Sequence, residues 1–226
     1  MLKALVTTNT AQDFLRTMNT AVGRKAHLGD PAKHQVVLNS ITAAHTAIEG
    51  GVETLARLAD DPTRSEPEKH DAARVIATRT IEALERSRAN IGANATKIER
   101  EATEAIEAQF APNPNRAGIE SEIRDWVRER AKAGDVAAIK EEAKRTPEVA
   151  AVLYHSPRFL LGLAKETHES FVIDAIETHA PKQYAAITES GELMRLAERY
   201  SPIIKSVRSS FYNQALADTA KRRVEV

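Results

Sequence analysis

Two series of apolar residues in the first half of the chain follow a heptad pattern. The first covers residues 38–55 and the second covers residues 77–105, and in both the spacing alternates between three and four residues. Such spacing places the apolar side chains along one side of a helix, as in the seam of a coiled coil. A turn-forming segment at residues 60–64 separates the two series. We therefore expect a long, coiled-coil-like helical hairpin within residues 1–110.

The second series predicts a helix over about residues 67–110, roughly 60 Å long at about 1.5 Å per residue. Its alanine-rich seam buries little apolar area, so the helix needs a partner. Segments 30–58 and 11–27 can supply one within the chain, giving a three-helix arrangement, or the seam can pair with another copy. The charged Arg88 within the seam leaves both alternatives open. The candidate self-association seam consists of Ile81, Leu84, Arg88, Ile91 and Ile98.

The second half of the chain is richer in aromatic residues. Eight of the ten aromatic residues follow residue 110, and aromatic side chains supply much of the buried area of a globular core. Between the halves, residues 111–115 contain two prolines, which disrupt a helix interior. Strand-type alternation is missing throughout. We predict an all-α chain with a hairpin domain at residues 1–110 and a compact, multi-helix domain at residues 111–226.

Prolines that follow a capping residue mark several helix starts. The capping side chain accepts from a free backbone N–H, and a proline in the first turn has no N–H to leave unpaired. Thr146-Pro147, Ser156-Pro157 and Ser201-Pro202 have this pattern. Together with Gly134-Asp135, they predict short helices over residues 135–145, 147–154, 157–178, 181–200 and 202–221.

Two further patterns predict local packing. Ser65 with Glu68, and Thr10 with Asp13, have the spacing of a capping box. An apolar stripe in the second half is expected to lie in the core of the compact domain. The stripe consists of Phe159, Leu160, Leu163, Phe171, Ile173 and Ile176.

Composition excludes several classes of protein. The 226 residues include no cysteine, which excludes disulfides and thiolate chemistry. Lys and Arg number 32 and so do Asp and Glu, so the chain lacks the overall basic charge of many nucleic-acid binders. No apolar run approaches the roughly 20 residues that span a bilayer, and the first residues are too polar for a secretory signal. We expect an intracellular protein.

Candidate chemistry is sparse. The seven histidines show neither the H-E-x-x-H nor the E-x-x-H pattern of helical metal sites. The triplet at residues 166–168 recurs at 177–179, about 16 Å further along a helix, so we expect His168 and His179 on a solvated face. Glycines beside charge at residues 23–25 and 29–31 are interpreted as loops. We expect no catalytic, cofactor-binding or metal site, and no cofactor.

The C-terminal stretch carries the only local charge imbalance. Basic residues outnumber acidic ones after residue 198, and Tyr200, Phe211 and Tyr212 lie among them. Such residues can contact phosphates and stack on bases, or they can form a helix that is favoured by its own dipole and packs its aromatics in the core. The candidate nucleic-acid contacts are Lys205, Arg208, Lys221, Arg222 and Arg223.

Three functional hypotheses remain. The first is a non-enzymatic structural protein that forms homo-oligomers or packs with other structural proteins, which the under-filled seam and the neutral charge favour. In style the chain resembles small all-helical virion proteins of tailed bacteriophages, such as head-to-tail connector or internal ejection proteins. That resemblance implies a location in the virion. The second hypothesis is a cytoplasmic protein-binding or regulatory module, and the third is a helical-bundle enzyme.

Overall fold

The computed structural model describes residues 3–220, and within this range the chain contains helices and no strand. The predicted all-α class is confirmed. The backbone forms two compact units: unit 1 comprises the chain up to Thr96 and again from Gly191, and unit 2 comprises Lys97–Ser190. Unit 2 is therefore an insertion into the sequence of unit 1. The predicted boundary at residues 111–115 falls inside unit 2.

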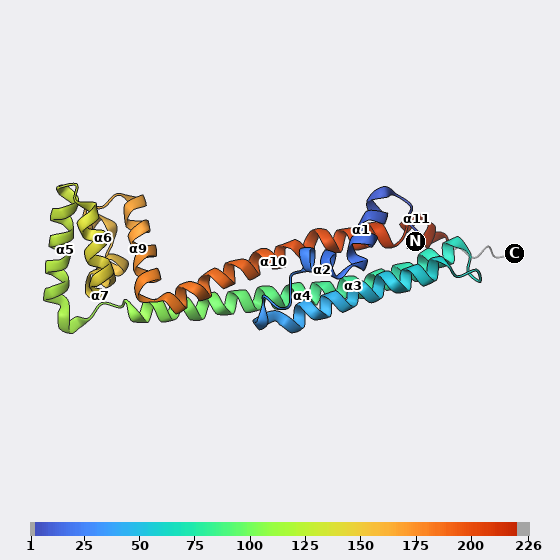
Figure 1. Cartoon of the computed structure of the whole chain (residues 1–226), viewed down its shortest axis with the longest axis horizontal. Coiled ribbons are helices and arrows are strands. Elements are labelled where there is room, and N and C mark those ends of the chain that lie inside the picture. The colour runs from blue at the N-terminus through green and yellow to red at the C-terminus, as the bar shows by residue number, and fades with distance from the viewer. Residues whose placement is uncertain (1–2, 221–226) are drawn as a thin grey trace. The chain divides into compact units, whose positions relative to one another are not determined.

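Unit 1 contains the long helical hairpin that the heptad spacing predicts. Helix α3 (Leu38–Ala59) and the first part of α4 (Glu66–Gln109) run antiparallel and side by side (Figure 1). Their buried positions are mostly Ile, Leu, Val and Ala. Helices α1 (Asn9–Asn19) and α2 (Ala21–Leu28) also pack against α3.

A further long helix of unit 1 comes from the C-terminal part of the chain. The part of α10 (Pro181–Phe211) that follows Gly191 belongs to this unit. A Cβ placed on Gly51 of α3 would lie 2.6 Å from Thr80 Oγ1 of α4 and 3.2 Å from the Phe211 ring of α10. Three helices thus meet at this glycine, one of them from the segment that we had predicted to lie in the second domain.

Helix α10 also continues through Pro202, where the sequence predicted a new helix start. Proline removes one helical hydrogen bond and disfavours this conformation locally. The side chains of Tyr200, Ile203 and Val207 on either side are buried. Burial on both sides of the proline outweighs the lost bond, so the prediction of two helices over residues 181–200 and 202–221 was wrong.

The N-terminal segment forms two helices rather than one. Thr20 interrupts it, and its side chain accepts from the Gly23 N–H at 3.0 Å to cap α2. Thr8, and not Thr10, caps α1 by accepting from Ala11 N–H. After α2, a loop and a short 3-10 helix, η1 (Gln35–Val37), delay the start of α3 until Leu38.

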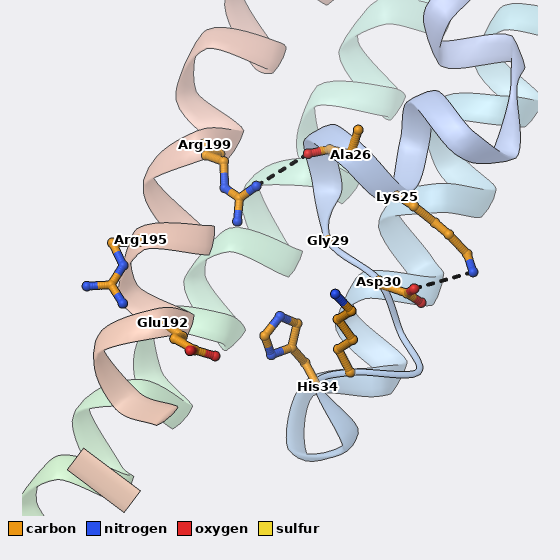
Figure 2. A pocket seen from close by; sticks show the side chains of 9 residues that line it. Lys25, Ala26, Gly29, Asp30, His34, Glu192, Arg195 and Arg199 are labelled. Carbon is orange, nitrogen blue, oxygen red and sulfur yellow. Dashed lines mark hydrogen bonds and ion pairs between the residues drawn. The ribbon is translucent and has the colours of Figure 1, made fainter. Parts of the chain in front are cut away.

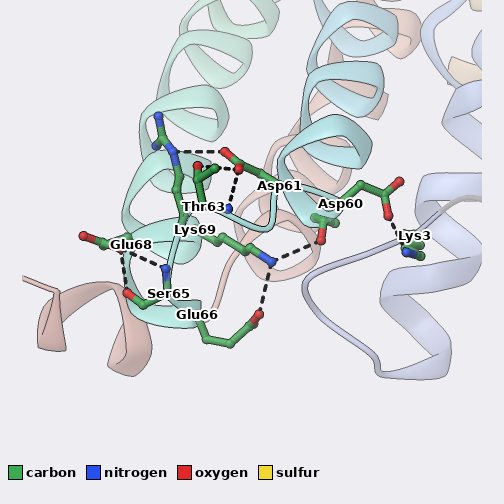
Figure 3. Close-up of polar contacts among 10 residues, drawn as sticks. Lys3, Asp60, Asp61, Thr63, Ser65, Glu66, Glu68 and Lys69 are labelled. Atoms are coloured by element: carbon green, nitrogen blue, oxygen red, sulfur yellow. Dashed lines mark hydrogen bonds and ion pairs between the residues drawn. The ribbon is translucent and has the colours of Figure 1, made fainter.

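The turn between α3 and α4 is built from side chains that bond to the backbone (Figure 3). The Asp61 carboxylate accepts from the Thr63 N–H at 2.9 Å and its hydroxyl at 2.6 Å. The Glu68 carboxylate accepts from the Ser65 N–H at 2.9 Å and its hydroxyl at 2.7 Å. These bonds lower the pKa of Glu68. The predicted pairing of Ser65 with Glu68 is confirmed.

Helix α11 (Gln214–Thr219) attaches the C-terminal segment to α4. The backbone N–H of Asn213 donates to His70 Nδ1 at 3.0 Å. Nearby, Arg74 pairs with Asp218 at 3.0 Å. His70 is buried, and burial lowers its pKa. Asn213 and Asp218, at the two ends of α11, are therefore tied to the first turns of α4.

Unit 2 is a group of short helices with the ends of α4 and α10. These are η2 (Pro114–Arg116), α5 (Ala117–Lys132), α6 (Val136–Arg145), α7 (Pro147–His155), α8 (Arg158–Leu161) and α9 (Lys165–His179). Asp135 caps α6 by accepting from the Ala138 N–H at 3.3 Å, and Pro147 begins α7. Both starts agree with the sequence prediction.

The core of unit 2 consists of two clusters of buried side chains. One includes Val127, Leu153 and Phe171, and the other includes Ile106 and Phe110. Branched and aromatic side chains dominate the first cluster, whereas the second packs Ile106 and Phe110 against Ala150, Ala175 and Ala180. Within residues 3–220, no helix combines the length and the apolar character needed to cross a membrane.

The predicted core stripe is only partly buried. Leu163 and Phe171 lie in the core, but Phe159 is 75% exposed, Ile173 52% and Leu160 38%. The physical reason is a break in the expected helix over residues 157–178. Gly162 ends α8 with a φ of 66°, in the left-handed region that glycine tolerates. Phe159 and Leu160 therefore do not share a helix face with Phe171. Ile173 is exposed for a different reason: it lies two residues from Phe171 on α9 and so on another side of that helix.

Candidate functional site

The candidate self-association seam is largely covered within a single chain. Leu84 and Ile91 are fully buried, Ile81 is buried and Ile98, in unit 2, is half-buried. Arg88 is exposed, and the buried position beside it belongs to Ser87. The charged residue thus lies outside the seam. Association between copies stays a prediction and would have to use other surfaces.

The C-terminal basic residues are partly brought together. Lys205, Arg208 and Tyr212 line a groove of about 470 Å³ with Ile204, Ser209 and Gln214, at the junction of α10 and α11. Lys205 and Arg208 are exposed and form no ion pair with any residue of the range 3–220. Lys221, Arg222 and Arg223 lie outside the described residues. A nucleic-acid contact at this groove stays a prediction.

The aromatic residues of the same stretch divide between core and surface. Tyr200 and Phe211 are fully buried, whereas Tyr212 is half-buried. Burial raises the pKa of the Tyr200 hydroxyl well above its usual range. Tyr200 and Phe211 therefore fit the interpretation in which the aromatics of this helix pack in the core.

A larger groove lies in unit 1, between the loop that follows α2 and the outer face of α10 (Figure 2). Its volume is about 760 Å³. We call it the α2–α10 groove. Its lining residues are Lys25, Ala26, Gly29, Asp30, Lys33, His34, Glu192, Arg195 and Arg199.

Hydrogen bonds fix the wall of this groove that is formed by the end of α2. The Tyr200 hydroxyl donates to the Leu28 carbonyl at 2.9 Å, and Arg199 Nη1 donates to the Ala26 carbonyl at 3.3 Å. The His45 ring donates to the Gly29 carbonyl at 3.0 Å. These donors satisfy carbonyls at a helix C-terminus, where the backbone offers no partner. The loop is therefore held against α10.

Gly29 is required for this close approach. Its φ is 97°, and an added Cβ would lie 2.9 Å from a methyl group of Leu196 on α10. A larger residue would be strained in its backbone and would also collide with α10.

The groove carries more positive than negative charge. Four Lys or Arg side chains and two carboxylates line it. Lys25 pairs with Asp30 at 3.4 Å. The Ala32 N–H bond to Asp30, together with Lys25, lowers the pKa of that carboxyl. Within the part of the chain that the structure describes, Lys33, Glu192 and Arg195 form no ion pair. The arrangement is suited to binding an anion.

Sequence reasoning missed this groove because its walls are far apart in the chain. The glycine and charged residues near residues 23–31 were noticed but were interpreted as loops. Arg195 and Arg199 are four residues apart, so they lie on one side of α10. Only the fold brings that side of the helix next to the α2 loop.

Two histidines of unit 2 bond to helix ends rather than facing solvent. His168 Nε2 donates to the Leu153 carbonyl at 2.9 Å, and His179 Nε2 donates to the Ala143 carbonyl at 2.7 Å. These carbonyls lie near the C-termini of α7 and α6, where such donors are favourable. The expected solvated face was therefore wrong: the repeated triplet places equivalent caps on two successive helices. Across residues 3–220, no group of three His, Asp or Glu side chains is placed to hold a metal ion.

A polar cluster links α5 to α7 in unit 2. Glu120 lies 3.6 Å from His155 and 3.8 Å from Arg124, and it also accepts from the Asn113 N–H at 2.8 Å. Burial lowers the pKa of His155, although Glu120 opposes that shift. The cluster connects the proline-containing segment at residues 111–115 to α5 and α7.

Comparison of the chain with protein-family models, with curated proteins and with solved structures finds no match. The grooves of unit 1 and the exposed apolar side chains of unit 2 are therefore the features from which a function can be inferred.

Proposed function

We propose that this protein is a non-enzymatic structural protein that packs against copies of itself through exposed apolar side chains of unit 2. The observation that carries the proposal is Phe159, a phenylalanine that is 75% exposed. A phenylalanine buries about 150–250 Å² in a core. At about 25 cal/mol per Å², covering this side chain contributes on the order of 3 kcal/mol before the costs of association.

The local structure holds Phe159 in place at the surface. It lies on α8, a helix of four residues between Pro157 and Gly162. Leu161 of the same helix is fully buried, and the Leu160 carbonyl accepts from Arg128 Nε at 3.0 Å. A backbone that is already fixed loses less conformational entropy when a partner covers the side chain that it carries. We therefore interpret the exposed Phe159 as part of a contact surface and not as a residue of a loosely held loop.

A virion component of a tailed bacteriophage, such as a head-to-tail connector or an internal ejection protein, is the specific class that we propose. Two observations support it: the resemblance to small all-helical virion proteins, and an architecture that combines long and short helices. Repeated copies in a ring or lattice would cover side chains such as Phe159 and Ile173. A cytoplasmic protein-binding module would use the same surface for a different partner.

The test is the mass of the full-length protein in solution, measured by light scattering after size exclusion over a range of concentrations. We expect an oligomer for the unmodified protein, and a dissociation constant raised roughly 100-fold by Phe159→Ser, the equivalent of about 3 kcal/mol. Val22→Ser is the matched control, because Val22 is 79% exposed on α2 of unit 1. The control should leave the mass unchanged.

Two results would count against self-association. One is a monomer at every concentration for the unmodified protein. The other is an oligomer that Phe159→Ser and Val22→Ser affect equally, which would place the contact elsewhere. A monomer that retains a second protein through Phe159 would instead indicate the binding module.

A further inference from the structure

We propose that the α2–α10 groove of unit 1 is a binding site for a small phosphorylated molecule that carries two or three linked phosphate groups. The site is separate from the apolar surface of unit 2 on which the proposed function rests. Lys25, Lys33 and His34 come from the α2 side, and Arg195 and Arg199 come from α10 (Figure 2). The inference rests on the charge, the rigidity and the size of this groove.

The charges of the groove are only partly compensated by the protein itself. Asp30 pairs with Lys25 at 3.4 Å, and the Ala26 carbonyl accepts one bond from Arg199 at 3.3 Å. Lys33 on the loop and Arg195 on α10 have no carboxylate partner among residues 3–220. Like charges that line one groove repel each other and concentrate anions there. An anion between the two walls would compensate both.

The spacing of the arginines favours an extended anion over a single phosphate. Arg195 and Arg199 are four residues apart on α10, which places their Cβ atoms about 6 Å apart. A guanidinium binds phosphate oxygens through two parallel N–H bonds and is suited to this role. Arg199 retains most of its N–H donors after its bond to Ala26. Linked phosphates offer each guanidinium its own set of oxygens and carry more negative charge than a single phosphate.

The groove is formed before any ligand binds. The hydrogen bonds from Tyr200, Arg199 and His45 to the end of α2 hold the loop, and Gly29 allows its close approach to Leu196. A site that needs no reordering loses less free energy on binding. The volume of about 760 Å³ lies within the range of about 300–1,000 Å³ that small-molecule pockets span.

Glu192 provides a test in which removing a negative charge should strengthen binding. It lies one turn before Arg195 on α10 and lines the same groove. Its carboxylate repels an anion bound there and accepts a hydrogen bond from any donor on the rest of the ligand. Neutralising it should therefore strengthen the binding of an anion that has no such donor.

The experiment is a calorimetric titration of the full-length protein at low ionic strength, with inorganic pyrophosphate and inorganic triphosphate as probes and orthophosphate for comparison. We expect one site for the two linked phosphates, and binding of orthophosphate at least about tenfold weaker. Lys33→Ala and Arg195→Ala should each weaken pyrophosphate binding roughly tenfold, because each removes one charge-assisted contact. Glu192→Gln should strengthen it several-fold.

The matched control is the double variant Lys205→Ala/Arg208→Ala. It removes two positive charges, one more than either single variant, from the groove at the junction of α10 and α11, and it should still leave pyrophosphate binding unchanged. All these side chains are exposed, and circular dichroism should show unchanged helicity. The assignment is overturned if pyrophosphate does not bind, if the control weakens binding as much as Arg195→Ala does, or if Glu192→Gln weakens it. None of these results bears on Phe159, so this site and the proposed function fail separately.

Discussion

The two units of this protein bury their apolar side chains in different ways. In unit 1, three long helices approach closely at small residues, as at Gly51 beside Thr80 and the Phe211 ring. In unit 2, short helices surround bulky side chains such as Leu153 and Phe171. A seam that depends on close approach tolerates added atoms poorly, whereas a core that depends on bulk tolerates their removal poorly. The difference predicts opposite sensitivities to mutation.

The largest expected effect is the loss of a core aromatic in either unit. Phe171→Ala should destabilise unit 2, and Tyr200→Ala should destabilise unit 1, each by about 3–5 kcal/mol. Tyr200 is fully buried and also donates to the Leu28 carbonyl at 2.9 Å. Hydrogen exchange read by mass spectrometry should show faster exchange mainly in the unit that carries the substitution.

Equal loss of protection in both units would contradict the separation of the two cores. Helices α4 and α10 each contribute residues to both units, so they are the elements through which such coupling would act. Tyr200→Phe separates packing from hydrogen bonding, because it leaves the Leu28 carbonyl without its donor and should cost about 1–2 kcal/mol.

An intermediate effect should distinguish two adjacent glycines of α3. Gly51→Ala adds a methyl group 2.6 Å from Thr80 Oγ1 and should destabilise unit 1 by about 1–3 kcal/mol. Gly50 has no neighbour within 4 Å of its Cβ position. Gly50→Ala should therefore stabilise the helix by about 0.5–1 kcal/mol, since alanine favours helix over glycine. Urea denaturation measures both.

If Gly51→Ala proved as stabilising as Gly50→Ala, the close contact of α3, α4 and α10 would be disproved. Replacing Thr80 with alanine in the Gly51→Ala background should recover part of the lost stability, because it removes the colliding oxygen.

The smallest effect concerns pH. Burial lowers the pKa of His70 from its ordinary 6.5, although Glu66 opposes the shift. As the pH falls below about 6.5, the unfolded chain therefore takes up the proton before the folded chain does, and unit 1 loses stability. Above that pH His70 is neutral in both the folded and the unfolded chain, so unit 1 keeps its full stability. His70 Nδ1 accepts from the Asn213 N–H, and protonation removes this bond.

We expect His70→Asn to lose less melting temperature between pH 7.5 and pH 5.5 than the unmodified protein loses. Some dependence will remain, because burial also lowers the pKa of His45 and His155. His27→Ala is the control, since His27 is exposed on α2. An unchanged pH dependence in His70→Asn would show that protonation of His70 does not cause the loss of stability at low pH.

The sequence predicts those features that depend on neighbours in the chain. The heptad spacing predicts the α3–α4 hairpin, and Ser65 with Glu68 predicts the start of α4. It fails where distant segments decide the outcome. Pro202 marks a helix start locally, yet burial of Tyr200 and Val207 keeps α10 continuous. The heptad spacing places Arg88 at a seam position, but in the structure Arg88 is exposed and Ser87 is the buried residue.

The candidate sites also divide into those set by neighbouring residues and those set by distant segments. Lys205 and Arg208 are neighbours in sequence and were found by charge alone. The α2–α10 groove could not be found in this way, because its walls lie more than 150 residues apart, as the bond from Tyr200 to Leu28 shows. Phe159 was expected in the core because a single helix was assumed. Gly162 is a residue type that commonly ends helices, but unlike Gly134 it was not used as a boundary in the prediction.

The insertion of unit 2 into the sequence of unit 1 has a consequence for synthesis. The hairpin of α3 and α4 leaves the ribosome before unit 2, and the part of α10 that covers it follows only after Ser190. Roughly 100 residues at about 5–20 residues per second take on the order of 5–20 s. During that interval the nascent hairpin has α1 and α2 beside α3 but lacks α10, so the apolar side chains that α10 covers are exposed to chaperones and to other nascent chains.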